Sequence, residues 1–493
     1  MASPTAVHRH WASLLGAGNG GRAGWPGTWI GRVPLAYWGF LVYWAMAVVL
    51  APERILNSDC SYQLFNSIQG RGFFFQEARY GMFITQVPVV AGILLHLPMK
   101  ALLLLYSSGL AGTYGLCIVL SRQVFGSPQA ALAIMLSLVV GVGDSFCHAT
   151  TETHLLLALS GLLYASLTWL WAGARSAWRH ALVALIVLWC LFTHPNALFT
   201  VGFVTLFALF SGKIKIADGL GILVLCAVYF AVRMLSLPES SYDSQQYDTL
   251  LHSSANLQRF WDLFPIWFIK QYLKNEYVAV VVILIALLVF LRPWYILLLT
   301  LSSAAVFWGI TILTFPDGSG EAMMEKSFMP GVFMLALPFA ALCTEHRWKH
   351  AFTILAALIM VQAFINIGMH SRYYGKRLAV LTHIFGKEGA RASKILVSKA
   401  DMKGTDLEFS GWATSIDALM LSRCMADTAR TIFIYDGPVG KEPGLNDPGA
   451  FLYLPWQWDV PAPLDTFYFN LPRRPYQLVH VKLTPRVGRF SDS

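Results

Sequence analysis

The chain consists largely of long apolar runs that carry almost no charge. The first run, residues 33–51, contains no Asp, Glu, Lys or Arg. A helix needs about twenty such residues to cross the hydrocarbon core of a bilayer, and lipid admits only helices and closed barrels as spanning structures. The sequence therefore predicts an α-helical polytopic membrane protein with about eleven transmembrane helices. The expected spans are residues 33–51, 98–120, 128–143, 155–172, 181–193, 197–211, 217–237, 278–291, 294–314, 329–344 and 350–369.

The composition supports this class and excludes others. Hydrophobic residues make up 56% of the chain and charged residues 13%, which is about half the charge of an average soluble domain. This excludes a disordered chain, a coiled coil and an ordinary cytosolic enzyme. The net charge is +9, but we expect no nucleic-acid partner, because Lys and Arg gather in the cytoplasmic loops of membrane proteins.

The distribution of charge between loops predicts the orientation. Alternate connections are short and almost purely basic, whereas the others hold most of the acidic residues. By the positive-inside rule, the N-terminal tail, residues 1–32, is cytoplasmic, the number of spans is odd, and the C-terminal segment lies outside the cytoplasm. The basic residues concerned are Arg122, Arg175, Arg179, Lys213, Lys215, Arg292, Arg347 and Lys349.

The transmembrane part, residues 33–369, is expected to carry its chemistry in outer loops. The first loop contains two weakly amphipathic stretches, residues 61–75 and 81–97, which predict helices lying at the membrane interface. No internal repeat is visible, which argues against most secondary-transporter folds. The outer loops are residues 52–97, 144–154, 238–277 and 315–328.

The tail, residues 370–493, is long enough to form a small domain of its own. It opens with a stretch typical of an amphipathic helix, residues 375–396, and ends with strand-like runs at residues 431–436 and 476–483. This pattern predicts an extracytoplasmic α/β domain. Among the seven cysteines, Cys60 and Cys147 lie outside the apolar runs or at their ends, and the sequence leaves open whether they form a disulfide.

Asp59 is the most informative polar residue, because it directly follows the first span on the outer side. A carboxylate at the boundary between water and lipid is a candidate general base, since partial desolvation would raise its pKa towards the working range of a base. The competing interpretation is a structural one. Ser58 or Asp59 could instead cap a helix that starts at Ser61.

Two longer segments carry a family resemblance. Residues 79–126 lead from a Pro-bearing loop helix into a second span that ends in the turn SRQVFG, and residues 325–342, EKSFMPGVFMLALPFAAL, open a late span. Together with the acidic residue after the first span, this layout resembles the GT-C glycosyltransferases. These membrane enzymes use polyprenyl-phosphate sugars and include dolichyl-phosphate-mannose and aminoarabinose transferases.

The resemblance implies an inverting glycosyltransferase of the bacterial inner membrane with a periplasmic C-terminal domain. Its donor would be a polyprenyl-phosphate-linked sugar, and its acceptor an extracytoplasmic glycan, lipid or protein. Asp59 takes the place of the catalytic carboxylate and would deprotonate the acceptor hydroxyl. Ser58 and Cys60 flank it, so the Asp–Glu pair of the protein mannosyltransferases is absent.

Cations and further polar residues complete the predicted site. Arg79 and Lys326 would bind the donor phosphate, Arg by bidentate hydrogen bonds and Lys as a point charge. As an alternative, both would anchor the chain at the lipid headgroups. The predicted cavity wall and acceptor site consist of Glu77, Tyr80, His148, Glu152, His154 and Glu325.

One polar cluster has two interpretations. Asp144, His148, Glu152 and His154 could bind a divalent metal, because His148 and Glu152 would share a helix face. Alternatively, they form a polar wall of the active site. This divalent metal is the one cofactor that the sequence suggests. Other polar residues are expected to serve the membrane fold: His194 or Asn196 would satisfy carbonyls freed by Pro195, and Arg233 would snorkel. Sugar stacking and an interfacial aromatic belt both explain Tyr242, Tyr247, Trp261 and Trp267.

Three functions remain for a chain of this kind. The first is the glycosyltransferase, which needs positioning, a base and cations for the leaving phosphate at the outer interface. The second is a transporter or flippase, for which ionisable residues near mid-membrane are expected. The third is a non-catalytic membrane subunit of a cell-envelope assembly, which would use the tail for docking.

Overall fold

The computed structural model describes residues 34–150, 152–172, 176–236, 238, 241–318, 320–387, 392–402, 413–435, 444–453 and 464–480. The expected cytoplasmic tail, residues 1–32, lies outside them. The described chain is mostly helical, and six of its helices are long and apolar enough to cross a membrane, which indicates an integral membrane protein. These are α6 (Met99–Val119), α8 (Glu152–Ala172), α11 (Ile216–Ser236), α16 (Trp294–Thr314), α17 (Glu321–Glu345) and α18 (Lys349–Lys387).

Shorter apolar helices occupy the other expected spans, so every expected span contains a helix. They have 10–17 residues, fewer than the roughly twenty of a straightforward crossing. The stretch interrupted by Pro195 forms two separate helices, as expected. The short helices are α2 (Leu35–Val49), α7 (Pro128–Ser137), α9 (Ala177–Thr193), α10 (Ala197–Phe210) and α15 (Val278–Phe290).

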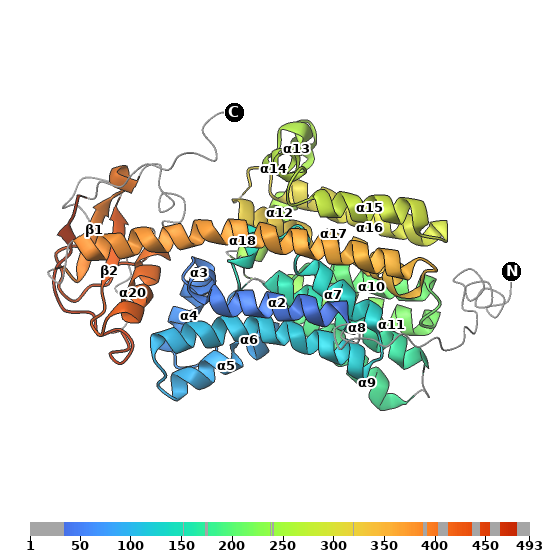
Figure 1. The fold of residues 1–493 in the computed structure, drawn as a ribbon, viewed down its shortest axis with the longest axis horizontal. Helices are drawn as coiled ribbons and strands as arrows, with labels where there is room; N and C mark the ends of the chain where they lie inside the picture. Colours follow the sequence, from blue (N-terminus) through green and yellow to red (C-terminus); the bar gives the residue numbers. More distant parts are fainter. Residues whose placement is uncertain are drawn as a thin grey trace.

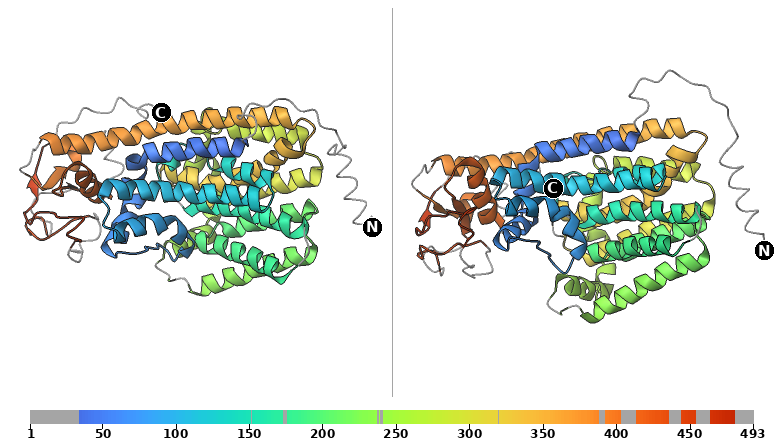
Figure 2. Two further views of the ribbon diagram at one scale, coloured as in Figure 1. Left: turned by 60° about the horizontal axis from the view of Figure 1, so that its bottom comes forward. Right: turned by 90° about the horizontal axis from the view of Figure 1, so that it is seen from below.

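The apolar helices lie side by side in one elongated body, and a small C-terminal domain lies at one end of it (Figure 1). The helix α18 runs along this body and reaches the domain, as two further views show (Figure 2). Each of the two expected loop stretches contains a helix, but both helices are shorter than expected: α4 ends at Gln69 rather than at residue 75, and α5 ends at Leu94 rather than at residue 97. The helices in the loops expected on the outer side are α3 (Ala51–Ile55), α4 (Asp59–Gln69), α5 (Phe83–Leu94), α12 (Tyr242–Leu251), α13 (Ser254–Leu257) and α14 (Phe264–Tyr272).

The helix α17 lies at the centre of the body. In the most apolar 18-residue stretch of α17, 89% of the residues are buried, against 22% in the corresponding stretch of α11. Glycine allows its neighbour to approach closely: a Cβ on Gly331 of α17 would lie 2.1 Å from the indole nitrogen of Trp308 on α16. Close packing of this kind stabilises helix association in lipid, where the hydrophobic effect does not hold helices together. The residues next to α17 are therefore held in a rigid frame.

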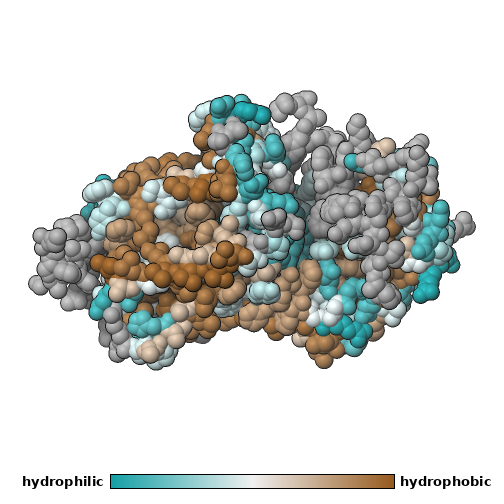
Figure 3. Space-filling model, turned by 180° about the vertical axis from the view of Figure 1, so that it is seen from behind, coloured by the Kyte–Doolittle hydropathy of each residue, from teal (hydrophilic) through white to brown (hydrophobic). Residues whose placement is uncertain are grey.

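The outer surface of the helical body is apolar. Space-filling colours show brown over the helices and teal mainly over the loops and the C-terminal end (Figure 3). On α11, Leu220, Val224, Val228 and Val232 follow one another at intervals of four residues, and all four are exposed. Such a stripe is unfavourable in water but suits contact with lipid.

The C-terminal domain contains a three-stranded parallel sheet in the order β2–β1–β3. Its elements are β1 (Lys394–Ser398), α20 (Thr414–Met425), β2 (Thr431–Tyr435) and β3 (Gln477–Leu478). The strands expected near residues 431–436 and 476–483 are present, although residues beyond 480 lie outside the described part. The helix expected to continue to residue 396 is wrong at its end, because Ile395, Leu396 and Val397 are buried and pair with β2.

Two other boundaries differ from the expectation. The helix α7 ends at Ser137 rather than at residue 143, since the chain turns there and Gly141 adopts a positive φ of 70°. The helix α18 continues past residue 369 without a break, because its polar residues His370 and Arg377 are buried against protein, with 2% and 1% exposure. One helix therefore links the membrane part to the C-terminal domain.

Candidate functional site

A cavity of about 1320 Å³ lies among the loops expected on the outer side and the helix ends that carry them. Its lining includes Asp59 and Arg79 from residues 52–97, Glu152 at the start of α8, and Lys326 near the start of α17. Residues of α10, α11, α12, α14, α16 and α18 also contribute to the wall. The proposed base and both proposed phosphate ligands therefore line one cavity.

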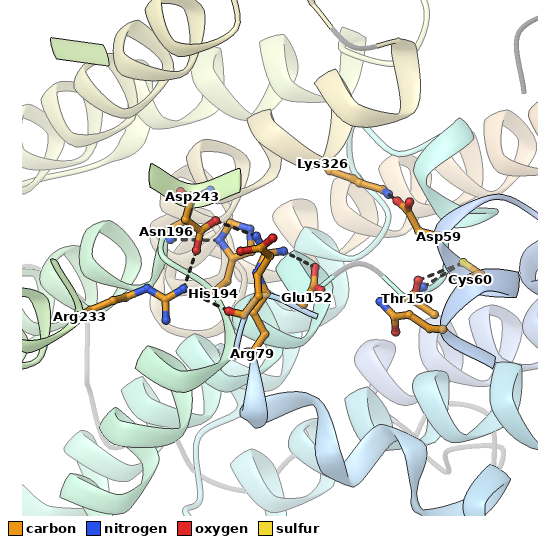
Figure 4. A network of polar contacts seen from close by, with 12 residues as sticks. Asp59, Cys60, Arg79, Thr150, Glu152, His194, Asn196, Arg233, Asp243 and Lys326 are labelled. Carbon is orange, nitrogen blue, oxygen red and sulfur yellow. Dashed lines mark hydrogen bonds and ion pairs between the residues drawn. The ribbon is translucent and has the colours of Figure 1, made fainter. Parts of the chain in front are cut away.

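Asp59 and Lys326 face each other in this cavity. Asp59 is the first residue of α4, and Lys326 Nζ lies 3.9 Å from its Oδ2 atom. The Lys326 side chain is 10% exposed and that of Asp59 48%. The two side chains point toward one another from different elements (Figure 4). The arrangement gives an accessible carboxylate with a cation beside it.

The helix-cap interpretation of Asp59 has no support in the hydrogen bonds of α4. Ser58 occupies the N-cap position with a φ of 43°, and its side chain makes no capping hydrogen bond. The Ser61 hydroxyl instead donates to the Ser58 carbonyl at 2.9 Å. Asp59 lies in the first turn, where the helix dipole favours a carboxylate, and its side chain faces the cavity.

Arg79 lies between two carboxylates in the cavity wall. Its Nη1 atom is 3.0 Å from Glu152 Oε2, and its Nη2 atom is 3.0 Å from Asp243 Oδ1. Asp243 Oδ2 also pairs with Arg233 Nη2 at 2.5 Å. Burial alone would lower the pKa of Arg79, but the charges of Glu152 and Asp243 raise it above its usual value. Arg233, expected to snorkel, is thus part of this network.

Two histidines in the cavity wall are held in the neutral form. Burial lowers the pKa of His148 well below its usual range, and the charge of Lys326 lowers it further. Burial, followed by the charges of Arg79 and Arg233, does the same to the pKa of His194. His194 Nδ1 accepts a hydrogen bond from the Asn196 amide at 3.1 Å, so this ring serves the local backbone.

Other expected wall residues lie at different depths. Glu77 lines the cavity, and its carbonyl accepts a hydrogen bond from Arg233 Nη2 at 3.4 Å. Tyr80 is 54% exposed and is not part of the lining. His154 is buried in the core, where its ring stacks on Tyr114 with 6.2 Å between the ring centres.

Glu325 lies just behind the wall and holds a loop in place. Its carboxylate accepts hydrogen bonds from the amides of Gly143, Asp144 and Ser145, at 2.9, 3.1 and 2.8 Å. It is 1% exposed. Glu325 therefore fixes the position of the Asp144 backbone rather than contacting the cavity itself.

The four residues of the expected metal cluster do not come together. Glu152 pairs with Arg79, and His154 faces the core. Among the described residues, the group that could hold a metal ion is instead Asp144, Glu325 and His370, whose ligand atoms lie within 4.8 Å of one another. Only Asp144 belongs to both sets.

Part of the cavity lining is apolar or aromatic. Tyr242, Tyr247 and Trp267 belong to it, whereas Trp261 is 72% exposed and is not part of the lining. Apolar and charged residues share elements here, since α11 carries Phe230 beside Arg233 and α12 carries the two tyrosines beside Asp243. The apolar residues of the lining include Phe230, Met234, Leu251, Phe264, Phe307 and Ile310.

Cys60 and Cys147 are free thiols and form no disulfide in the structure. Thr150 donates to Cys60 Sγ at 3.2 Å, and Cys147 Sγ donates to Ser371 Oγ at 3.6 Å. Both thiols are buried.

Several residues that shape the site were not found from the sequence. Some of them carry a recognisable signal, an isolated ionisable residue inside or beside an apolar helix, which is typically functional or partnered. Arg54, for example, is 1% exposed and donates to the Phe146 carbonyl at 3.0 Å and to Ser107 Oγ at 2.7 Å. The residues concerned are Arg54, Asp243, Glu276, His370, Arg377 and Asp417.

No protein-family model matches the chain, and no curated protein or solved structure is significantly similar to it. The GT-C resemblance therefore stays a prediction. The interpretation of the cavity rests on its own geometry and charge.

Proposed function

We propose that the protein is a membrane glycosyltransferase that transfers a sugar from a polyprenyl-phosphate carrier to an extracytoplasmic acceptor. The observation that carries this proposal is the placement of Asp59 and Lys326 in one cavity, 3.9 Å apart. A base and a cation side by side are what an acceptor hydroxyl and a leaving phosphate require. The acceptor class, a glycan, lipid or protein, is left open.

The chemistry is a single displacement. The acceptor hydroxyl oxygen attacks the anomeric carbon and its proton passes to the Asp59 carboxylate. The bond between the anomeric carbon and the phosphate oxygen breaks, and the phosphate keeps the electron pair. Lys326 stabilises the added negative charge. Attack opposite the leaving group inverts the anomeric centre, and no metal or covalent intermediate is needed.

The shape and polarity of the cavity support a lipid-linked donor. Phe230, Phe264 and Phe307 supply apolar surface to its lining, whereas Asp59, Lys326 and Arg79 supply charge. An isoprenoid chain would pack against the former, and the sugar and phosphate would bind near the latter. Arg79 already pairs with Glu152 and Asp243, so it binds phosphate only by giving up or sharing a carboxylate.

The proposal includes the cellular arrangement. About eleven crossings with a cytoplasmic N-terminus would place the cavity and the C-terminal domain on the periplasmic side of a bacterial inner membrane. Five short connections carry basic residues and no acidic ones: those between α6 and α7, α8 and α9, α10 and α11, α15 and α16, and α17 and α18. The nearby acidic residues Asp218 and Glu345 lie within helices. This charge bias supports the orientation.

Asp59→Asn tests the proposal, because it keeps the shape of the side chain and removes the proton acceptor. Membranes that contain the protein are supplied with polyprenyl-phosphate mannose, glucose or arabinose labelled in the sugar. The transfer rate is expected to fall by about 10²–10⁴, while donor binding changes little.

Asp248→Asn is the matched control, because the Asp248 side chain is 73% exposed and lies outside the cavity lining. It should retain the full rate. An Asp59→Asn protein with an unchanged rate would remove the proposed base. Movement of labelled lipid across the bilayer without sugar transfer would instead favour a flippase.

A further inference from the structure

Three ligand groups from separate elements meet behind the cavity wall. Asp144 lies in the turn after α7, Glu325 in α17 and His370 in α18, and their ligand atoms lie within 4.8 Å of one another. Glu325 and His370 are 1% and 2% exposed and Asp144 is 8% exposed. Asp144 also lines the cavity. The group is therefore buried but borders the space where a substrate would lie.

The ring of His370 is oriented by a fourth residue. Its Nε2 atom lies 2.7 Å from Glu276 Oε1. A carboxylate can only accept a hydrogen bond, so Nε2 carries the proton. In the neutral ring this leaves a lone pair on Nδ1. A carboxylate that fixes the tautomer of a histidine in this way is typical of metal sites.

The Nδ1 atom of His370 is buried and has no hydrogen-bond partner among the described residues. It nevertheless lies 3.1 Å from Asp144 Oδ1. Two lone pairs at this separation repel each other unless a proton or a cation lies between them. The contact thus requires either a second ring proton or a cation bound by both atoms.

The carboxylates around the ring favour a cation of more than one charge. Asp144, Glu276 and Glu325 surround the single imidazole of His370, and one ring proton would leave several negative charges uncompensated in a buried place. Glu325 accepts one amide hydrogen bond on Oε1 and two on Oε2. Because each oxygen has two lone pairs, Oε1 retains one for a ligand bond.

We propose that Asp144, Glu325 and His370 bind a zinc ion, with Glu276 as the residue that orients His370. Imidazole nitrogen and carboxylate oxygen are both zinc ligands, and a site with three protein ligands leaves the fourth position for water, whereas calcium and magnesium prefer oxygen alone. The ion would join α17, α18 and the turn after α7. Because Lys326 directly follows Glu325 in α17, the ion would also help to fix the cation that faces Asp59.

The metal content of the full-length protein tests this inference independently of any transfer assay. The protein is purified in detergent without chelator, and its metals are measured by inductively coupled plasma mass spectrometry. About one zinc per chain is expected. After removal with EDTA, titration with zinc chloride should restore the same stoichiometry and raise the melting temperature.

Variants locate the ion. His370→Gln and Asp144→Asn should lose the zinc, and Glu276→Gln should weaken zinc binding by about 10–100-fold, because only the orientation of the ring changes. His148→Gln is the matched control, since His148 lines the same cavity but is not a ligand, and it should keep the zinc.

The results that overturn the proposal are equally definite. A wild-type protein that contains almost no zinc and shows no shift of its melting temperature with zinc chloride would overturn the proposal. It would mean that His370 carries a second ring proton, on Nδ1, which donates to Asp144. Zinc retained by a folded His370→Gln protein would place the ion elsewhere. A different metal at one per chain would overturn the assignment to zinc.

Discussion

Arg377 of α18 and Asp417 of α20 form an ion pair whose side chains are 1% and 0% exposed. Arg377 Nη1 also donates to the Leu56 carbonyl at 2.8 Å. Burial raises the pKa of the Asp417 carboxyl, and the Arg377 guanidinium opposes that effect. The C-terminal domain is thereby connected to the segment that leads into Asp59. We infer that the domain helps to position the proposed base.

The first prediction concerns this pair. Asp417→Ala leaves the Arg377 guanidinium buried without its carboxylate, and we expect a loss of stability of about 3–5 kcal/mol. Thermal unfolding in detergent measures it. The variant should also lower the transfer rate more than donor binding, because the segment before Asp59 loses a support.

The control is His252→Gln, which removes an exposed contact with Asp248. The two side chains are 77% and 73% exposed, and a pair of that kind contributes about 0–1 kcal/mol. A similar loss of stability in both variants would contradict a special role for the buried pair.

The second prediction concerns the coupling between Lys326 and Asp59. Lys326→Gln removes the cation next to the base, and the transfer rate should fall by about 10²–10³ if Lys326 stabilises the leaving phosphate. Lys326→Arg should restore part of the rate, since it keeps the charge but changes its shape.

A double-mutant cycle with Asp59→Asn tests the contact itself. Residues that act together show a coupling free energy of about 0.5–3 kcal/mol, whereas independent sites give additive effects. Rate losses that simply add would mean that the 3.9 Å separation has no functional meaning.

The helices could be predicted from the sequence, because the length of an apolar run and its lack of charge directly determine a helix in lipid. Asp59 could be located by its place after the first span. A span ending at residue 369 and a separate helix from residue 375 were also expected, but their union in one continuous helix, α18, was not. That continuity depends on partners such as Asp417 of α20, which only the folded chain brings near.

The pairing of charges could not be predicted. Arg79 and Asp243 are separated by 164 residues, and no periodicity of either segment relates one to the other. The same holds for His370 and Glu276, which are 94 residues apart. The sequence grouped Asp144 with His148, Glu152 and His154 as a candidate metal cluster, whereas the structure groups it with Glu325 and His370. Residues that are neighbours along the chain can point in different directions, so spacing alone could not give this grouping.

The third prediction concerns Asp243, which connects α12 to two arginines. Its carboxylate contacts Arg79 at 3.0 Å and Arg233 at 2.5 Å. In Asp243→Asn, Arg79 retains Glu152, but Arg233 loses its carboxylate, so stability should fall by about 3 kcal/mol. Hydrogen exchange of the α12 amides should accelerate, because the contact that holds this helix is lost.

Asp248→Asn on the same helix is the control. Its side chain is 73% exposed, and a substitution of that kind changes stability by less than about 0.5 kcal/mol. Unchanged hydrogen exchange in α12 of Asp243→Asn would show that other contacts hold the helix.

The last prediction is a pH dependence of stability that arises from His148 and His194. Burial lowers the pKa of both rings well below 6.5 in the folded protein. The unfolded chain therefore binds more protons than the folded one below that pH. The contribution of these two rings to stability should be constant above about pH 7 and fall as the pH drops through about 6, by up to about 1.4 kcal/mol per pH unit for each histidine.

Melting temperatures of the wild-type protein, His148→Gln and His194→Gln between pH 7.5 and 5.5 measure this contribution. Each variant should lose less stability than the wild type as the pH falls. His252→Gln should follow the wild-type profile, since the His252 side chain is 77% exposed. A His148→Gln or His194→Gln profile that runs parallel to the wild-type profile would contradict the neutral state of that ring.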